Sequence, residues 1–364
     1  MRTFLFKLAA FPLFLAVFLE LVFRTLVPAA EMPAGFQDQD YMIMALDRSS
    51  PRDGIHTLGR LGRPAFRWRI NNYGFNSAID YVPPAERGKP CVAVIGDSYT
   101  QGLYADVEAH LAGRLQAALG GTCDVYNLAT SGMPFSQCPP VVRFAEAQFA
   151  PDLIVIQAGS SSLVRSLRST GLVRYCQQYA VAGESLQPLP PTPFRVNKRN
   201  RLLRKSALVR YLYHNANLNP GGAGDIVKAM EEAGDDPDFL LGVPRELCDE
   251  LLDRIFAEIA AASPDTPVLV VFDANRNDLH ATGARPPRLA ESPVVEQGCR
   301  RNGVHFLDLT DAFWSEYQQH GRMFNFTNNY HWNPYGVSVV ARAIETEIGR
   351  SEQMARAIRS RRGD

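Results

Sequence analysis

The sequence predicts an α/β fold, a three-layer sandwich in which a mostly parallel five-stranded sheet lies between helices. Between residues 89 and 350, short apolar runs alternate with segments of helical periodicity. The runs are continuously apolar, which is typical of strands buried on both faces. Strands that alternate with helices in this way favour a parallel sheet covered on both sides, of the flavodoxin-like kind.

The expected elements follow one another along that region. Strands are expected at Cys91–Ile95, 124–128, 153–157, 267–272 and 304–309. Helices are expected at 105–119, 141–149, Arg245–Ala262, 292–302 and 334–348. Pro334 suits the first turn of the last helix, because a missing N–H costs nothing there. A shorter strand followed by a turn is expected earlier, at 67–75.

An insertion interrupts the alternation at residues 163–241. It contains a proline cluster at 188–193, a basic helix-like stretch at 201–214 and a glycine-rich acidic loop at 221–238. Open α/β sheets bind ligands at the carboxyl ends of their strands, so we expect the insertion to cover that edge. The other divisions are an N-terminal anchor at 1–27, a linker with a short strand at 28–88, the main domain at 89–350 and a basic tail at 351–364.

The first 27 residues differ in composition from the rest of the chain. Arg2 and Lys7 precede an apolar stretch from residue 8 to residue 23, which only Glu20 interrupts. Its length falls between that of a signal-peptide core and that of a spanning helix, but Pro28 fits a cleavage site poorly. An uncleaved transmembrane anchor is therefore favoured over a cleaved signal, with the N-terminus in the cytoplasm. The domain is then expected in the periplasm or outside the cell, tethered to the inner membrane.

Charge and cysteine content narrow the possible partners. Lysine and arginine number 38, as do aspartate and glutamate, so nothing favours a nucleic acid. Six cysteines suit an oxidising compartment. Cys91 and Cys123 open strands that should be neighbours, which makes a Cys91–Cys123 disulfide the first expectation. No Cys-x-x-Cys and no pair of histidines at ligand spacing occurs, so neither a metal nor another cofactor is expected.

Ser98 is the candidate nucleophile, in the Gly-Asp-Ser turn that follows the first strand. A helix is about to begin there, so the hydroxyl is exposed and unpaired backbone N–H groups lie close to it. Gly96 lets the backbone approach closely. A serine reacts only with a base and a site for the oxyanion. His331 is the expected base, because its polar loop precedes the last helix and a parallel sheet could bring it beside the first strand.

These segments resemble the SGNH or GDSL hydrolases, a superfamily of lipases and esterases, and most of all its membrane-anchored bacterial members. The resemblance covers roughly residues 69–348 and implies an SGNH-hydrolase-like fold. Gly96-Asp97-Ser98 matches the first block, which supplies the nucleophile and one oxyanion N–H. The segment from Asn127 to Gly132 matches the second block, whose glycine N–H is an oxyanion donor. The segment from His331 to Gly336 matches the last block, whose histidine is the general base.

The chain departs from the family pattern at two places. Where the third block has an asparagine that donates to the oxyanion, this sequence has Ser161, whose hydroxyl is a donor of shorter reach. Where the family has an aspartate two or three residues before the histidine, this sequence has Asn328 and Asn329. An amide oxygen can hold the histidine tautomer but brings no charge. Asn328, Asn329 or a backbone carbonyl is therefore expected to orient His331.

The resemblance implies an extracytoplasmic serine esterase or O-acyltransferase that acts on acyl esters of carbohydrate or lipid through a Ser98–His331 dyad. Similar anchored proteins take part in acetylating exported polysaccharides, so a membrane-bound acyl-transfer partner is also implied. The alternative is a catalytically inactive member of the envelope that binds a glycan or a membrane partner.

Overall fold

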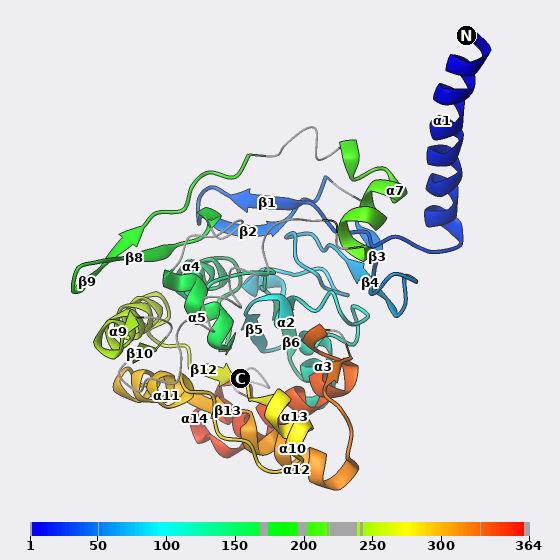
Figure 1. The fold of residues 1–364 in the computed structure, drawn as a ribbon. Coiled ribbons are helices and arrows are strands. Elements are labelled where there is room, and N and C mark those ends of the chain that lie inside the picture. Colours follow the sequence, from blue (N-terminus) through cyan, green and yellow to red (C-terminus); the bar gives the residue numbers. More distant parts are fainter. Residues whose placement is uncertain are drawn as a thin grey trace.

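The computed structural model describes residues 2–49, 51–167, 174–195, 202–216, 218, 239–240, 243–327 and 329–359. Side chains are described from residue 10 onward within these ranges, except at 239 and 240. Figure 1 shows a central sheet enclosed by helices, with a long N-terminal helix projecting from the body. The expected α/β architecture is therefore confirmed.

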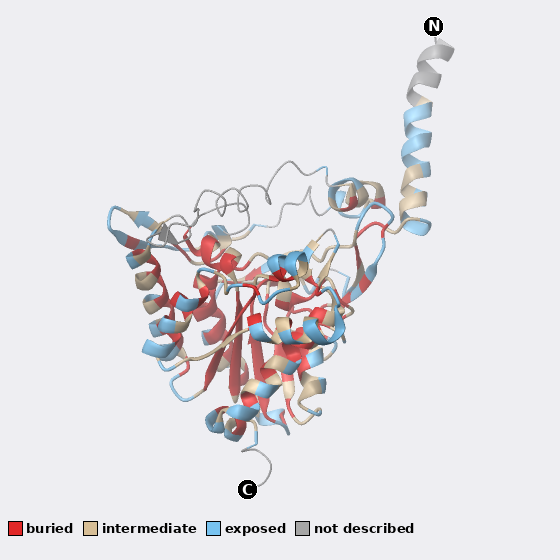
Figure 2. Ribbon diagram, turned by 60° about the horizontal axis from the view of Figure 1, so that its bottom comes forward, coloured by how far each residue is buried: buried red, intermediate tan, exposed pale blue. Residues whose placement is uncertain are grey.

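The central sheet has five strands, all parallel, in the order β13-β12-β7-β5-β6. They are β5 (Cys91–Ile95), β6 (Asp124–Asn127), β7 (Leu153–Ala158), β12 (Val268–Phe272) and β13 (His305–Asp308). β5 has the expected bounds, and the others differ from them by one residue at one or both ends. Figure 2 shows the sheet as a deeply buried layer. β5, β7 and β12 are buried along their whole length, which accounts for their largely apolar sequences.

Helices cover both faces of the sheet. One face is covered by α4 (Cys138–Phe149), α9 (Arg245–Ala262) and α11 (Ser292–Arg301). The other is covered by α3 (Leu111–Ala118), α12 (Thr310–His320) and α13 (Pro334–Arg350). Alternate side chains of β5 enter the two cores: Ala93 packs on the first face and Val92 on the second. Burying a side chain of the size of Val92 contributes about 1.5–3 kcal/mol.

Two helices begin at other residues than expected. α3 begins at Leu111 instead of 105, because the Nδ1 atom of His110 accepts a hydrogen bond from the Gly113 N–H at 3.0 Å and caps the helix. α4 begins at Cys138 instead of 141, since two prolines occupy its first turn, where no N–H is needed.

The region at 28–88, expected as a linker with one strand at 67–75, instead forms two antiparallel hairpins. These pair β1 (Gly35–Asp38) with β2 (Ile43–Leu46), and β3 (Asp53–Thr57) with β4 (Ala65–Arg69). The strand ends at Arg69 because the Asn71 side chain closes a turn, accepting a hydrogen bond from the Phe75 N–H at 2.9 Å. Tyr81 fastens the region to the sheet, since its hydroxyl donates to Asn127 O at 3.0 Å and accepts from Asn127 N at 2.7 Å.

The insertion is described in part. Its elements are α5 (Ser160–Leu167), β8 (Gln178–Ala182), β9 (Ser185–Leu189), α7 (Ala207–Arg210), a π-helical turn (Tyr211–Asn215), and β10 (Phe239–Leu240), which pairs with β11 (Val243–Pro244). β8 packs against α5, which follows the carboxyl end of β7, so this part of the insertion lies at the expected edge. The acidic loop expected at 221–238 lies outside the described residues. In the C-terminal tail, α14 (Glu352–Ala357) packs against α13.

Two further expectations concern the N-terminus and the cysteines. α1 (Arg2–Thr25) is helical, but among the helical residues described with their side chains, none forms a stretch long and apolar enough to cross a membrane.

The expected Cys91–Cys123 disulfide is wrong. Although β5 and β6 are neighbours, Cys91 packs in the core on one face of the sheet and Cys123 in the core on the other.

Candidate active site

Ser98 lies at the start of the short helix α2 (Ser98–Gln101), directly after β5. The Asp97 side chain caps this helix by accepting a hydrogen bond from the Tyr99 N–H at 3.0 Å. A side chain at Gly96 would bring its Cβ within 2.5 Å of Thr100 Oγ1, so the turn requires glycine. The tight turn therefore presents Ser98 at the carboxyl end of a central strand.

His331 lies in β15 (Asn329–Trp332), which pairs with β14 (Asn325–Phe326) just before α13. Its Nε2 atom is 2.7 Å from Ser98 Oγ, and its Nδ1 atom is 2.5 Å from Asn329 Oδ1. Because an amide oxygen only accepts, Nδ1 must carry the proton and Nε2 must accept from the serine. The two candidate catalytic side chains, 233 residues apart in sequence, thus meet in the geometry that a serine and its base require.

Gly132 and Ser161 are connected to the segment that carries Ser98 through neighbouring residues. Gly132 adopts a φ of +78°, and the neighbouring Ser131 N–H donates to Gln101 Oε1 on α2 at 3.2 Å. The Ser161 hydroxyl lies 3.4 Å from Arg165 Nη1, which is also 3.5 Å from Asp97 Oδ2. The second and third blocks therefore face the turn that carries Ser98. Asn328 lies outside the described residues.

Two aromatic rings stack against the imidazole of His331. The ring centroids of Tyr99 and Tyr104 lie 4.6 and 4.0 Å from that of the imidazole, with interplanar angles of 30° and 23°. Burial lowers the pKa of His331 to about 3, and the positive charges of Arg276, His56 and Arg165 act in the same direction. His56 adds its charge only in acid, since burial also lowers its own pKa to about 4. His331 is therefore a neutral imidazole at neutral pH, able to accept a proton but costly to charge.

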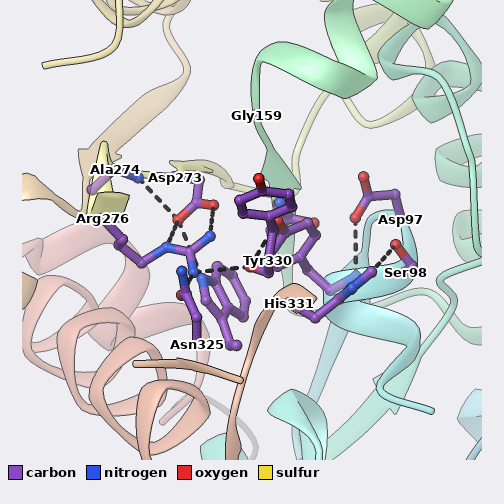
Figure 3. A network of polar contacts seen from close by, with 12 residues as sticks. Asp97, Ser98, Gly159, Asp273, Ala274, Arg276, Asn325, Tyr330 and His331 are labelled. Carbon is purple, nitrogen blue, oxygen red and sulfur yellow. Dashed lines mark hydrogen bonds and ion pairs between the residues drawn. The ribbon is translucent and has the colours of Figure 1, made fainter. Parts of the chain in front are cut away.

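A buried ion pair that the sequence analysis did not single out holds the loop of His331. Arg276, in α10 (Arg276–Thr282), donates to Asp273 Oδ2 from Nη2 at 2.6 Å and to Asp273 Oδ1 from Nε at 3.2 Å. Its Nη1 atom donates to the Tyr330 carbonyl at 3.1 Å and to the Asn325 side chain. Figure 3 shows this network on one side of His331 and Ser98 on the other.

Aromatic side chains add further contacts to this network around the loop of His331. The Trp332 Nε1–H donates to Asp273 Oδ1 at 3.2 Å, and the Tyr99 hydroxyl donates to the Tyr330 carbonyl at 3.1 Å. The guanidinium of Arg276 lies 5.5 Å from the centre of the Tyr99 ring, within the range of a cation–π contact. Residues on both sides of His331 are thus fixed to the end of β12. The one sequence feature that could have indicated the ion pair is its place directly after a buried strand.

Within the described part of the chain, no three metal-ligating side chains gather into a site for an ion. The arrangement that is present suits attack of the Ser98 hydroxyl on an activated carbonyl, with His331 taking the proton.

No protein-family profile matches the chain, and no curated protein matches its sequence. Several solved structures are similar to it. One is a two-domain esterase active on acetylated mannans, 14% identical, with 72% of this chain and 49% of that chain covered at a TM-score of 0.38. Another is a carbohydrate esterase family 2 enzyme with a carbohydrate-binding domain from Corynascus thermopiles, 13% identical, covering 75% and 69% at a TM-score of 0.36. A third is a salicylyl-acyltransferase from a tetracycline biosynthetic pathway, 13% identical, covering 73% and 56% at a TM-score of 0.39.

This chain spans about half the length of that mannan esterase. At these identities and TM-scores, the similar structures do not indicate what this chain does. Its function has to be inferred from the geometry of its own site.

Arg276→Gln is expected to slow hydrolysis of p-nitrophenyl acetate roughly 100-fold, because releasing the Tyr330 carbonyl misplaces His331. The rate would be measured below the unfolding transition of the variant, since Asp273 is left buried without its partner. The control is Arg285→Gln, which breaks an exposed ion pair with Asp311 and should leave the rate of hydrolysis unchanged. A folded Arg276→Gln protein with the wild-type rate would contradict the positioning role of this residue.

Proposed function

We propose that the protein is a serine esterase or O-acyltransferase of the SGNH kind. The observation that carries the proposal is the 2.7 Å contact from Ser98 Oγ to His331 Nε2, with Nδ1 held by Asn329. A serine with its hydroxyl on a correctly oriented imidazole is the minimal machinery of nucleophilic acyl transfer.

In the proposed reaction, Ser98 Oγ attacks the acyl carbonyl of an ester while its proton passes to His331 Nε2. The tetrahedral intermediate collapses, the bond to the leaving alcohol breaks, and that alcohol takes the proton from Nε2. Water or an acceptor hydroxyl then attacks the acyl-enzyme, gives its proton to Nε2, and Ser98 leaves with that proton restored. Hydrolysis and transfer differ only in which hydroxyl enters at the second step.

The developing oxyanion needs hydrogen-bond donors that are already in place. We assign this role to the backbone N–H groups of Ser98 and Gly132, with the hydroxyl of Ser161 as the third donor. The geometry that supports the assignment is the hydrogen bond from Ser131 N–H to Gln101 of α2, and the contact of Ser161 with Arg165, which pairs with Asp97.

Electrostatics distinguishes this site from a Ser-His-Asp triad. Arg276 and Arg165 disfavour an imidazolium at His331, and Asn329 offers no negative charge to offset them. Each arginine is also paired with a carboxylate, Arg276 with Asp273 and Arg165 with Asp97, so neither brings a net positive charge to the oxyanion. The proposed enzyme therefore depends on the N–H and hydroxyl donors to stabilise the oxyanion, and less on a strong base.

The second candidate is an inactive domain that binds a glycan or a membrane partner. The lowered pKa of His331 and the asparagine on its Nδ1 atom favour this alternative, since both weaken the base.

We propose that the substrate is an acyl ester of a carbohydrate or lipid outside the cytoplasm, and that a membrane-bound protein supplies acyl groups if the reaction is transfer. In this proposal α1 tethers the domain to the inner membrane. The support is the apolar stretch of α1, which Arg2 and Lys7 precede and acidic residues follow at Glu31, Asp38 and Asp40.

A fluorophosphonate probe should label the purified protein covalently, and Ser98→Ala should abolish the labelling, because the probe phosphonylates only an activated serine. Ser338→Ala is the matched control, since the Ser338 hydroxyl donates to a helix carbonyl and should not react. Mass spectrometry of the labelled peptide identifies the site. If folded wild-type protein takes up no probe, the proposed serine enzyme is ruled out and the inactive binding domain is favoured.

Asn329→Asp should keep or raise the rate of p-nitrophenyl acetate hydrolysis, since a carboxylate on Nδ1 stabilises the imidazolium. It should also change the pH profile. The wild-type base, with a pKa of about 3, stays neutral from pH 5 upward, so its rate should not fall as the pH drops from 8 to 5. In the variant the pKa rises, so the rate should fall with acid inside that window. A large loss of rate at all pH values would show that another group orients His331.

A further inference from the structure

From Phe11 to Phe18 the side chains of α1 are all apolar and all exposed. Phe11, Phe14, Val17, Phe18 and Leu21 are each more than half exposed. A helix that is apolar all round is normally buried in protein or lipid. Within the described residues, protein covers only its C-terminal end, where it packs against α7.

That end of α1 is firmly held by the segment at 202–218. The carboxylate of Glu20 accepts hydrogen bonds from the Ser206 hydroxyl at 2.7 Å and from the N–H groups of Ala207 and Leu208 at 2.9 Å. These are the first N–H groups of α7, so Glu20 caps that helix. Glu20 is also paired with Arg24 at 2.6 Å. The one charge that interrupts the apolar stretch is thereby satisfied.

Two more contacts fix the angle between α1 and this segment. The rings of Phe23 and Tyr211 stack with their centroids 3.7 Å apart. The Asn215 side chain accepts from the Ala30 N–H at 3.0 Å and donates to Thr57 Oγ1 at 3.0 Å and to Gly59 O at 2.9 Å. The segment therefore forms one unit with the foot of α1 and the β3–β4 hairpin, as Figure 1 shows.

This unit exposes an apolar surface, which we call the collar patch. Its members are large side chains with between 39% and 77% of their surface exposed: Leu26, Leu61, Leu202, Leu203, Leu212, Tyr213 and Leu218. Exposed basic residues lie among them in the sequence: Arg24, Arg60, Arg63, Arg204 and Lys205. Glu20 pairs with Arg24, and Glu31 pairs with Arg210. Among the described residues, Arg60, Arg63, Arg204 and Lys205 stay outside these ion pairs and supply the positive charge of the patch. An apolar surface with unopposed positive charge is typical of a segment that lies in the headgroup layer of an anionic membrane.

We propose that the collar patch binds an anionic lipid surface and lies in its headgroup layer beside α1. This inference rests on the proposed membrane location and extends it, because it gives the domain a fixed orientation instead of a flexible tether. The β3–β4 hairpin links the patch to the active site. His56 in β3 contacts the Tyr104 ring edge to face, and Tyr104 stacks on His331. The proposed orientation therefore keeps the active site near the membrane surface, within reach of lipid-linked esters.

The test uses the full-length protein in vesicles of phosphatidylglycerol and phosphatidylcholine whose acyl chains are brominated, which quenches nearby tryptophan. Leu202→Trp and Leu212→Trp report on the collar patch, and Val17→Trp reports on α1. The matched control is Val181→Trp, which is 43% exposed on the β8–β9 hairpin away from α1. The fluorescence of tryptophans at 202 and 212 should be quenched about twofold, because residues of an interfacial segment lie about 5–10 Å deep in the headgroup layer. The fluorescence of the tryptophan at 181 should not be quenched.

Charge reversal at Arg204 and Lys205 to glutamate should reduce the quenching at position 212 and leave that at position 17 unchanged. Quenching at 17 without quenching at 202 and 212 would overturn the proposed lipid contact and leave the tether intact. No quenching at 17 either would overturn both the tether and the inference that rests on it. Neither result bears on the proposal that Ser98 is a nucleophile, which the probe labelling of Ser98 tests separately.

Discussion

The ion pair between Asp273 and Arg276 is the interaction on which the active site depends. It lies at the carboxyl end of β12, two strands away from the nucleophile strand β5. From there Arg276 reaches the carbonyl of Tyr330, and Asp273 receives the indole N–H of Trp332. These contacts bracket His331, so its ring meets Ser98 in one orientation. Without these contacts, the loop before α13 would lose conformational entropy each time His331 took up its position beside Ser98.

The same arrangement sets the electrical character of the site. A guanidinium near the imidazole opposes its protonation, and the second arginine, Arg165, does so from the side of Ser161. In most Ser-His-Asp sites a carboxylate on Nδ1 compensates for burial of the imidazole. Here the amide of Asn329 supplies direction without charge. What the structure shows in place of that charge is the rigid placement of His331 by the contacts of Tyr330 and Trp332.

The sequence was sufficient to predict the sheet and the meeting of Ser98 with His331. Both follow from position, since residues after parallel strands and before the last helix gather at one edge. The Asp273–Arg276 pair escaped prediction because it matches no motif and acts through the backbone of Tyr330. The Cys91–Cys123 disulfide failed because neighbouring strands do not imply a shared face: side chains alternate between the faces, and these two enter different cores. The hairpins at 28–88 could not be read from sequence, as their short strands lack a sustained pattern.

The chemistry inferred for Ser98 requires a neutral His331, with its proton on Nδ1 facing Asn329 and its Nε2 atom accepting from Ser98. Nuclear magnetic resonance of protein labelled with ¹⁵N at histidine tests it directly, because the two ring nitrogens shift differently with protonation. The His331 signals should show a protonated Nδ1 and a bare Nε2 that do not titrate between about pH 5 and 8. Titration near the ordinary histidine value of about 6.5, or a proton on Nε2 at neutral pH, would show that His331 is not held as the neutral base of Ser98.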